Sequence, residues 1–472
     1  MAEQTQAASS AAVRTNSAAF TPDAPPVDHV HPPIQVIGCL ISLAVTAAMG
    51  AAAARLVPLT GIRPPPMLSM LFTGVLLRNL FPSIIVSIPH SWTTKLWSLA
   101  LTAAIARAGL TLKLDRNLWQ VLKIGSIPLL VESTVLMWLA FSVLRLPLPF
   151  AALFAFGIGS ISPGVVVPLL FATKERMAVK RSGGLPLTQN AAELALGNDL
   201  QGLLSILLGS IGIDVFVATT VFGISLSISF GVPVSVWNVA KELATGLLLG
   251  TFLGAGLGWT IHTYAGRYFG VAGVYLGSAI AMMALKQQGS VGAASLVVML
   301  AWSTWANGGT VQHEDLVWAD QQLKRVWTLL EPLLFPIIGS SIFLGEMPVS
   351  VVVPCVLIIS CGFVFRMLAT YLVSRELVGF GHIESMYASG VWIGKASVQA
   401  TLCTAAIEMV HSVHFEHRRE NYYSQVVFVG MVTATLLAPP IASALAHRLE
   451  SELMMTPPVT PHGQQLKESD LH

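Results

Sequence analysis

The sequence predicts an all-α protein that crosses a membrane many times. Hydrophobic residues make up 54% of the 472 residues and charged residues only 11%, whereas soluble domains contain roughly 25% charged residues. The mean hydropathy is +0.70, and apolar runs of about 20 residues, long enough to span a bilayer, recur along the chain. This composition excludes a soluble enzyme. The net charge of only +2 gives no reason to expect a nucleic acid as a partner.

Apolar runs bounded by proline, glycine and charged residues predict about thirteen transmembrane helices. In the first half of the chain we expect them at 34–57, 65–81, 95–112, 121–145, 149–172 and 202–230. In the second half we expect them at 238–262, 269–285, 290–306, 326–345, 349–374, 385–409 and 424–446. An odd number of spans places the termini on opposite sides. Lysine and arginine concentrate in one set of alternate loops, which predicts a cytoplasmic C-terminus.

Three segments do not fit the pattern of spans joined by short loops. Residues 1–33 and 451–472 are predicted to be disordered tails, so that residues 34–450 form the transmembrane domain. Residues 173–201 are too polar to span and too long for a turn, and we expect a cytoplasmic insertion there.

The four cysteines are isolated in apolar runs, which indicates buried free thiols and no metal site; they are Cys39, Cys355, Cys361 and Cys403.

Two of the predicted spans carry helix-breaking residues in the middle. The fifth contains Gly159, Ser160, Ser162 and Pro163 in quick succession. Proline removes a backbone donor, and unwound backbone at membrane depth is tolerated only where it lines a cavity or lies within protein. A simple proline kink is the alternative. Because the segment 390–397 of the twelfth span again combines glycines, a serine and a cation, the pattern is typical of an inverted-repeat transporter with interrupted helices.

Four charged residues lie deep inside predicted spans. Asp214 stands near the middle of the sixth span, where a charged side chain costs roughly 2.5–3.5 kcal/mol on insertion scales. Such a carboxylate is suited to exchanging a proton for a metal cation. The alternative is a permanent ion pair with Lys395 that only holds two helices together. Because each charge needs a partner, we pair Asp214 with Lys395, and Glu132 with Arg366 as a structural ion pair.

Asn198 and Asp199 form a second candidate site at the polar edge of the sixth span. Asparagine and aspartate are favoured where helices begin. We therefore expect a helix cap or loop here, and cation binding remains the alternative.

Three segments together resemble the NHA branch of the sodium/hydrogen (cation/proton) antiporters: SISPGVVVP from Ser160, GIDVFVATTVF around Asp214, and WIGKASVQA around Lys395. The segments PLLVES and FRML extend the resemblance over roughly residues 65–445 in the same order. It implies an inverted-repeat antiporter fold with two crossed broken helices, in the fifth and twelfth spans. Core helices would lie at about 121–230 and 349–446, and dimerisation or scaffold helices at about 34–112 and 238–345.

The resemblance further implies a secondary-active antiporter that works as a homodimer in the lipid bilayer. Sodium or lithium, with potassium as a further candidate, would compete with protons at Asp214. Because a hard cation prefers oxygen ligands, Ser162, the backbone around Pro163 and Thr219 would complete the ion site, with Lys395 compensating charge. No resident cofactor is expected beyond the transported ions.

The chain departs from the NHA pattern at the ion site itself. NHA-type members have adjacent aspartates in the sixth span, whereas this chain has Asp214-Val215, or Ile213-Asp214 one residue out of register. A single acid can exchange fewer protons per cation. A transport-inactive relative is therefore one alternative. A sodium-coupled organic anion symporter on a similar inverted-repeat scaffold is the other. An enzyme is not expected, because the sequence has neither an HExxH nor a GxSxG motif.

Overall fold

The structure is a computed structural model, and it describes residues 32–56, 66–82, 90–111, 118–181, 198–229, 236–287, 290–308, 311–340, 345, 349–396, 398–399, 402 and 418–455. Every regular element in these ranges is helical. Within them, seven helices are long and apolar enough to cross a membrane, and three further apolar helices are shorter. The predicted all-α class with many spans is confirmed. The count of thirteen spans stays a prediction.

The first half of the chain folds into seven described helices. They are α2 (Pro32–Leu56), α3 (Pro66–Leu80), α5 (His90–Thr111), α6 (Leu118–Ser142), α7 (Leu148–Gly159), α8 (Pro163–Arg181) and α10 (Asn198–Ser229). The predicted fifth span is thus two helices, α7 and α8. Helices α8 and α10 also enter the predicted insertion from both sides, and residues 182–197 lie outside the described residues.

The second half begins with a helix that passes through a π-helical turn: α11 (Val236–Thr251), η2 (Phe252–Gly258) and α12 (Trp259–Ala265). It continues with α13 (Arg267–Gln287), α14 (Val291–Ala306), α15 (His313–Ser340), α16 (Val349–Leu372), η4 (Val373–Val378), α17 (His382–Val391) and α19 (Arg418–Met455). The predicted C-terminal tail begins too early, because buried Leu449 and Leu453 keep α19 packed as far as Met455. The predicted N-terminal tail lies almost wholly outside the described residues.

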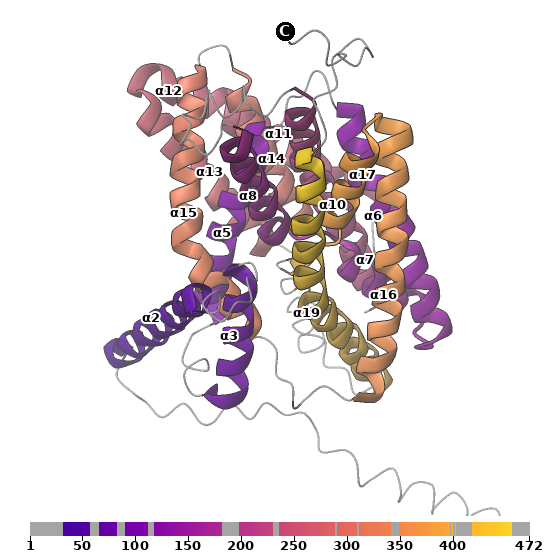
Figure 1. The fold of residues 1–472 in the computed structure, drawn as a ribbon. Coiled ribbons are helices and arrows are strands. Elements are labelled where there is room, and N and C mark those ends of the chain that lie inside the picture. The colour runs from indigo at the N-terminus through magenta and orange to yellow at the C-terminus, as the bar shows by residue number, and fades with distance from the viewer. Residues whose placement is uncertain are drawn as a thin grey trace, which may run out of the picture.

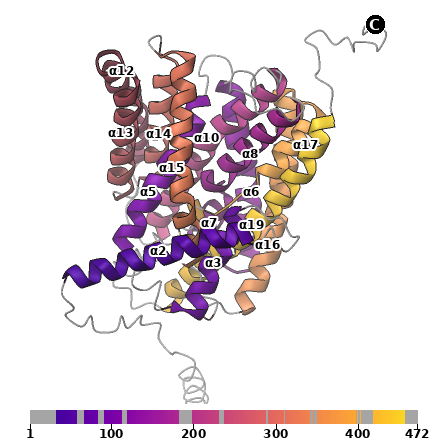
Figure 2. The same cartoon turned by 60° about the vertical axis from the view of Figure 1, so that its left-hand side comes forward.

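The helices pack in two groups (Figures 1 and 2). Helices α6, α7, α8, α10, α16, α17 and α19 contact one another, and so do α2, α3, α5, α11, α13, α14 and α15. Contacts of α10 with α14, and of α5 with α10 and α8, join the groups. The groups comprise residues 118–229 with 349–455, and 32–111 with 236–340. That the first group is a moving core and the second a dimerisation scaffold stays a prediction.

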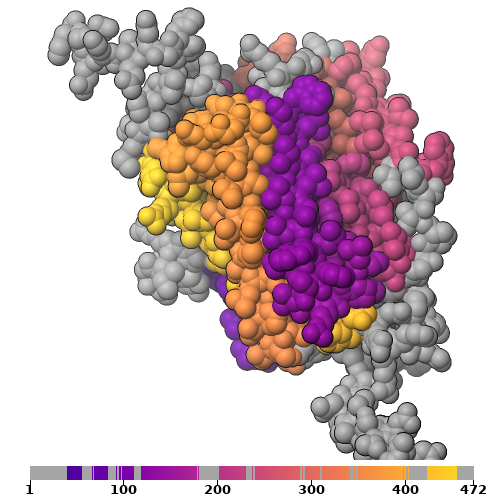
Figure 3. Space-filling view, turned by 90° about the vertical axis from the view of Figure 1, so that its right-hand side faces the viewer, coloured from indigo at the N-terminus to yellow at the C-terminus, as the bar shows by residue number. Residues whose placement is uncertain are grey.

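The outer face of α16 shows how the fold directs apolar side chains outward and charge inward. On this helix, six apolar residues at helical spacing are 47–74% exposed: Val349, Val353, Leu357, Val364, Leu368 and Leu372. The opposite face buries Arg366 completely. Helices α16 and α6 lie side by side on this surface (Figure 3). Apolar side chains facing outward from an apolar helix suit a lipid environment.

Candidate functional site

The first element of the site is the interruption between α7 and α8. Helix α7 ends at Gly159 and α8 begins at Pro163, and the three residues between them, Ser160, Ile161 and Ser162, are completely buried. Proline lacks the N–H that a continuing helix would need, but it is well suited to the first turn of a new one. The carbonyls that end α7 and the N–H groups that follow must therefore find other partners.

The second element is the non-helical backbone after α17, which ends at Val391. Two hydrogen bonds tie it to its surroundings: the N–H of Ser162 donates to the Gly394 carbonyl over 2.9 Å, and Arg366 Nε donates to the Trp392 carbonyl over 2.8 Å. The two interruptions therefore face each other. Beyond residue 396 only 398, 399 and 402 are described, so the crossed pair of broken helices stays a prediction.

A single guanidinium connects the charged residues of the site. Arg366 Nη1 donates to Glu132 Oε2 and to the Gly159 carbonyl, both over 2.7 Å. Its Nη2 donates to Asp214 Oδ2. The planar fork of an arginine suits such a junction because it presents several donors in fixed directions. Arg366 thus links α6, α10 and both interruptions.

Lys395 completes the cluster. Its Nζ donates to Glu132 Oε2 over 3.0 Å and to the Gly159 carbonyl over 2.8 Å. All four charged side chains are completely buried, and the formal charges of two acids and two bases cancel. A buried charge without a partner is strongly destabilising, so this balance is the central electrostatic property of the site.

The predicted pairing of Asp214 with Lys395 is corrected by these contacts. Asp214 binds Arg366, whereas Lys395 binds Glu132. The physical reason is that one guanidinium can serve two carboxylates at once, so Arg366 holds Glu132 and also takes Asp214. Sequence reasoning identified the four charges, but it assigned one partner to each.

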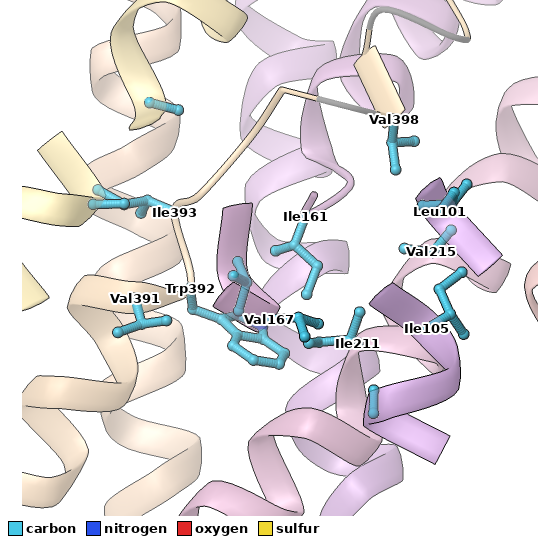
Figure 4. Close-up of a cluster of buried hydrophobic side chains, with 14 of the residues drawn as sticks. Leu101, Ile105, Ile161, Val167, Ile211, Val215, Val391, Trp392, Ile393 and Val398 are labelled. Carbon is cyan, nitrogen blue, oxygen red and sulfur yellow. The ribbon is translucent and has the colours of Figure 1, made fainter. Parts of the chain in front are cut away.

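Asp214 has both carboxylate oxygens engaged. Oδ1 accepts from the backbone N–H of Ile161 over 2.8 Å, and Oδ2 accepts from Arg366. The residues next to Asp214 in the sequence and Ile161, its backbone donor, are apolar or buried: Ile161, Ile211 and Val215 belong with Trp392 to one buried hydrophobic cluster (Figure 4). Because such surroundings weaken dielectric screening, the bonds to Asp214 are stronger than they would be in water.

The other predicted ion ligands lie on two different elements. Ser162 and Pro163 stand at the interruption, and the Ser162 carbonyl accepts from the N–H groups of Val165 and Val166 in the first turn of α8. Thr219 is five residues beyond Asp214, which places it about 140° around α10. Its hydroxyl donates to the Val215 carbonyl over 2.7 Å. Helix geometry therefore sets Thr219 apart from the carboxylate.

Asn198 and Asp199 are the first two described residues of α10, and the predicted helix cap stays a prediction. Asp199 precedes Asp214 by fifteen residues of continuous helix, a separation of about 22 Å along the axis. The two acids therefore cannot share one ion site. The side chains of Asn198 and Asp199 are not among those described.

Sequence reasoning missed two uncharged members of the site, the Gly159 carbonyl and the Gln399 amide. The Gly159 carbonyl accepts hydrogen bonds from both Arg366 and Lys395. Gln399 donates to carbonyls at the end of α7. A polar amide in an apolar run was the available signal for Gln399.

Among the described residues, no group of three metal-ligating side chains occurs. Cys355 and Cys361 are free, the first buried and the second only partly.

The chain is similar over most of its length to sodium/hydrogen exchangers. It is 28% identical over 432 residues to human sodium/hydrogen exchanger 9B2, covering 88% of this chain and 74% of that protein. The mouse protein is 28% identical over 396 residues, covering 81% and 67%. Human exchanger 9B1 is 26% identical over 404 residues, covering 79% and 70%. The resemblance to the NHA branch is confirmed. No family model matches the chain.

Solved structures of an antiporter share the fold of this chain. The sodium proton antiporter MjNhaP1 from Methanocaldococcus jannaschii superposes with a TM-score of 0.60 at 16% identity, covering 90% of this chain and 99% of that one. A second structure of MjNhaP1, at pH 8, gives a TM-score of 0.51. At this identity the likeness concerns the fold alone. The apolar helices and the sodium/hydrogen exchangers among its relatives support an integral, multi-pass membrane protein.

Proposed function

We propose that this protein is a secondary-active antiporter that exchanges a monovalent cation, sodium or lithium with potassium as a further candidate, for protons by alternating access. The observation that carries the proposal is Asp214, a completely buried carboxylate held between an interrupted helix and Arg366. The sodium/hydrogen exchangers among its relatives support the same reading.

Competition at Asp214 follows from the way Arg366 is held. In this proposal, a cation or a proton that binds Asp214 at Oδ2 takes the place of the Nη2 donor. Arg366 can release this one bond because it retains Glu132, the Gly159 carbonyl and the Trp392 carbonyl as partners. Arg366, supported by Lys395, thus acts as an internal cation that occupies Asp214 when the site is empty. If cation and proton exclude each other at one site, a gradient of either drives the other.

A cation that displaces the guanidinium would bind Asp214 Oδ2 and neutral oxygens from the interruption. Ser162 and the backbone around Pro163 are the candidates, since hard cations prefer oxygen. A single carboxylate holds either one cation or one proton, and the loaded site carries the same charge in both cases. We therefore propose one proton per cation and exchange that does not respond to membrane potential.

The test is cation-induced proton flux in proteoliposomes that contain the purified wild-type protein. Sodium, lithium and potassium are added in turn, with and without an imposed membrane potential. We expect proton release on addition of sodium or lithium, independent of the potential. Folded protein that exchanges with none of the three cations would contradict the proposal and favour the transport-inactive relative. Sodium uptake that requires an organic anion and moves no protons would favour the symporter.

An ion pair between the two helix groups gives a prediction about alternating access. Lys324 Nζ of α15 lies 2.5 Å from Glu175 Oε1 of α8, and both side chains are about half exposed. Because an exposed pair contributes at most about 1 kcal/mol, Lys324→Glu should change the exchange rate by no more than about fivefold. The double variant Lys324→Glu/Glu175→Lys should return the rate towards wild type, because it restores the pair. Equal rates in all three proteins would show that this pair does not bias the two access states.

The homodimer is also proposed. Native mass determination of the detergent-solubilised protein should give twice the mass of 50.2 kDa. A monomer that still exchanges cations in liposomes would contradict it.

The cytoplasmic position of the C-terminus likewise stays a prediction, and a protease-accessible tag at the C-terminus in right-side-out vesicles would test it.

A further inference from the structure

The carboxamide of Gln399 donates hydrogen bonds at the end of α7, although Gln399 lies 239 residues beyond Ser160 in the sequence. Its Nε2 donates to the carbonyls of Ser160 over 2.6 Å, Ile158 over 3.2 Å and Gly157 over 3.3 Å. Two of these belong to the last turn of α7 and the third to the residue after it. Carbonyls at the end of a helix need partners other than the N–H groups of a continuing helix.

The orientation of this amide is determined by its surroundings. The side chain is completely buried, and its Oε1 has no hydrogen-bond partner among the residues that the structure describes. Reversing the amide would bring that oxygen against three carbonyl oxygens. The three acceptors therefore hold the NH2 group at α7.

The shortest of the three bonds is connected to Asp214 through one peptide group. The carbonyl of Ser160 and the N–H of Ile161 belong to the same planar unit and point in opposite directions. Gln399 holds the carbonyl, and the N–H donates to Asp214 Oδ1 over 2.8 Å. A hydrogen bond at one end of a peptide strengthens the bond at the other. One rigid plane is thus held between Gln399 and the carboxylate.

We propose that Gln399 is a positioning residue for ion binding at Asp214. It keeps the Ser160–Ile161 peptide in the orientation that aims its N–H at the carboxylate. This inference rests on the proposed antiport at Asp214, but the placement of the peptide is measurable without transport. Without Gln399 the peptide can rotate, and the carboxylate that receives the cation loses a directed donor.

The test compares Gln399→Met, which has similar length and no donor, with Asn307→Leu. The Asn307 amide also donates to a carbonyl, that of Ser303 over 2.7 Å on its own helix α14, so this control removes an amide donor away from the site. In Gln399→Met we expect the KM for sodium to rise about tenfold, as for the loss of a hydrogen bond to a charged group, with a smaller change in maximal rate. Asn307→Leu should leave the KM within about twofold, since it lies outside the site.

The variant Gln399→Glu adds a signature that a packing role would not produce. When protonated, the new side chain can donate to the Ser160 carbonyl; when ionised, it repels all three carbonyls. Its KM for sodium, relative to wild type at the same pH, should therefore be close to normal at acidic pH and rise steeply at alkaline pH. A ratio that stays constant with pH would overturn the proposal.

Hydrogen–deuterium exchange at the Ile161 amide separates this inference from the proposed function. In Gln399→Met the amide should exchange faster than in wild type, whereas Asn307→Leu should leave it unchanged. Unchanged exchange in Gln399→Met would overturn the inference whatever the transport result. If wild type transports no cation, the proposed function fails, and the exchange rate of this amide still decides the placement. If Gln399→Met does not fold, the pH dependence of the KM for sodium in Gln399→Glu tests the role of Gln399 instead.

Discussion

Asp214→Asn is expected to abolish cation-induced proton flux, down to the level of empty liposomes. Asparagine has the same size and can still accept from the N–H of Ile161, but it holds neither a proton nor a cation by charge. Because Asp214 is the only acid on the continuous helix α10 beyond its first turn, no neighbouring carboxylate on this helix can replace it. The measurement is the fluorescence of an internal pH indicator after addition of sodium.

The matched control is Asp199→Asn, an identical substitution on the same helix about 22 Å away. It should retain flux close to wild type. If Asp199→Asn abolishes flux and Asp214→Asn does not, the ion site lies at the start of α10. If neither substitution reduces flux, neither acid of this helix carries the exchanged proton.

Arg366→Met is expected to have the largest effect on stability. It removes the partner of Asp214 and one partner of Glu132, and it leaves the buried cluster with a net charge of −1. Removing one member of a buried ion pair typically destabilises a protein by about 3–5 kcal/mol. Glu132→Gln should destabilise for the opposite reason, since it leaves a net charge of +1. Thermal unfolding in detergent would report both losses.

The double variant Glu132→Gln/Arg366→Met distinguishes charge balance from packing. It restores neutrality, because Lys395 and Asp214 remain, and it frees Lys395 to approach Asp214. We expect the double variant to be less destabilised than the sum of the two single variants, as for coupled neighbours. Strictly additive losses would show that packing, and not charge balance, determines the stability of the cluster. Arg375→Met, which removes a well-exposed partner of Glu376, should leave the melting temperature unchanged.

The charged members of the site were accessible from sequence because a charge in an apolar run is costly wherever it occurs. Asp214, Arg366, Glu132 and Lys395 all stand out for this reason, and all four meet in the structure. The interruption at Pro163 was accessible for a comparable reason, since proline removes a helical donor. Gln399 was not found, because an uncharged amide gives a much weaker signal and its role depends on the carbonyls it meets.

The sequence by itself determined the all-α membrane class, the approximate positions of the helices and the identity of the buried charges. These depend on local properties: hydrophobicity, helix breaking and the cost of a lone charge. Only the tertiary structure decided that Asp214 pairs with Arg366 and Lys395 with Glu132, and that the Gly159 carbonyl serves both cations. Partner choice depends on distances between helices more than one hundred residues apart in sequence, and a guanidinium that can reach two carboxylates makes any one-to-one assignment from sequence ambiguous.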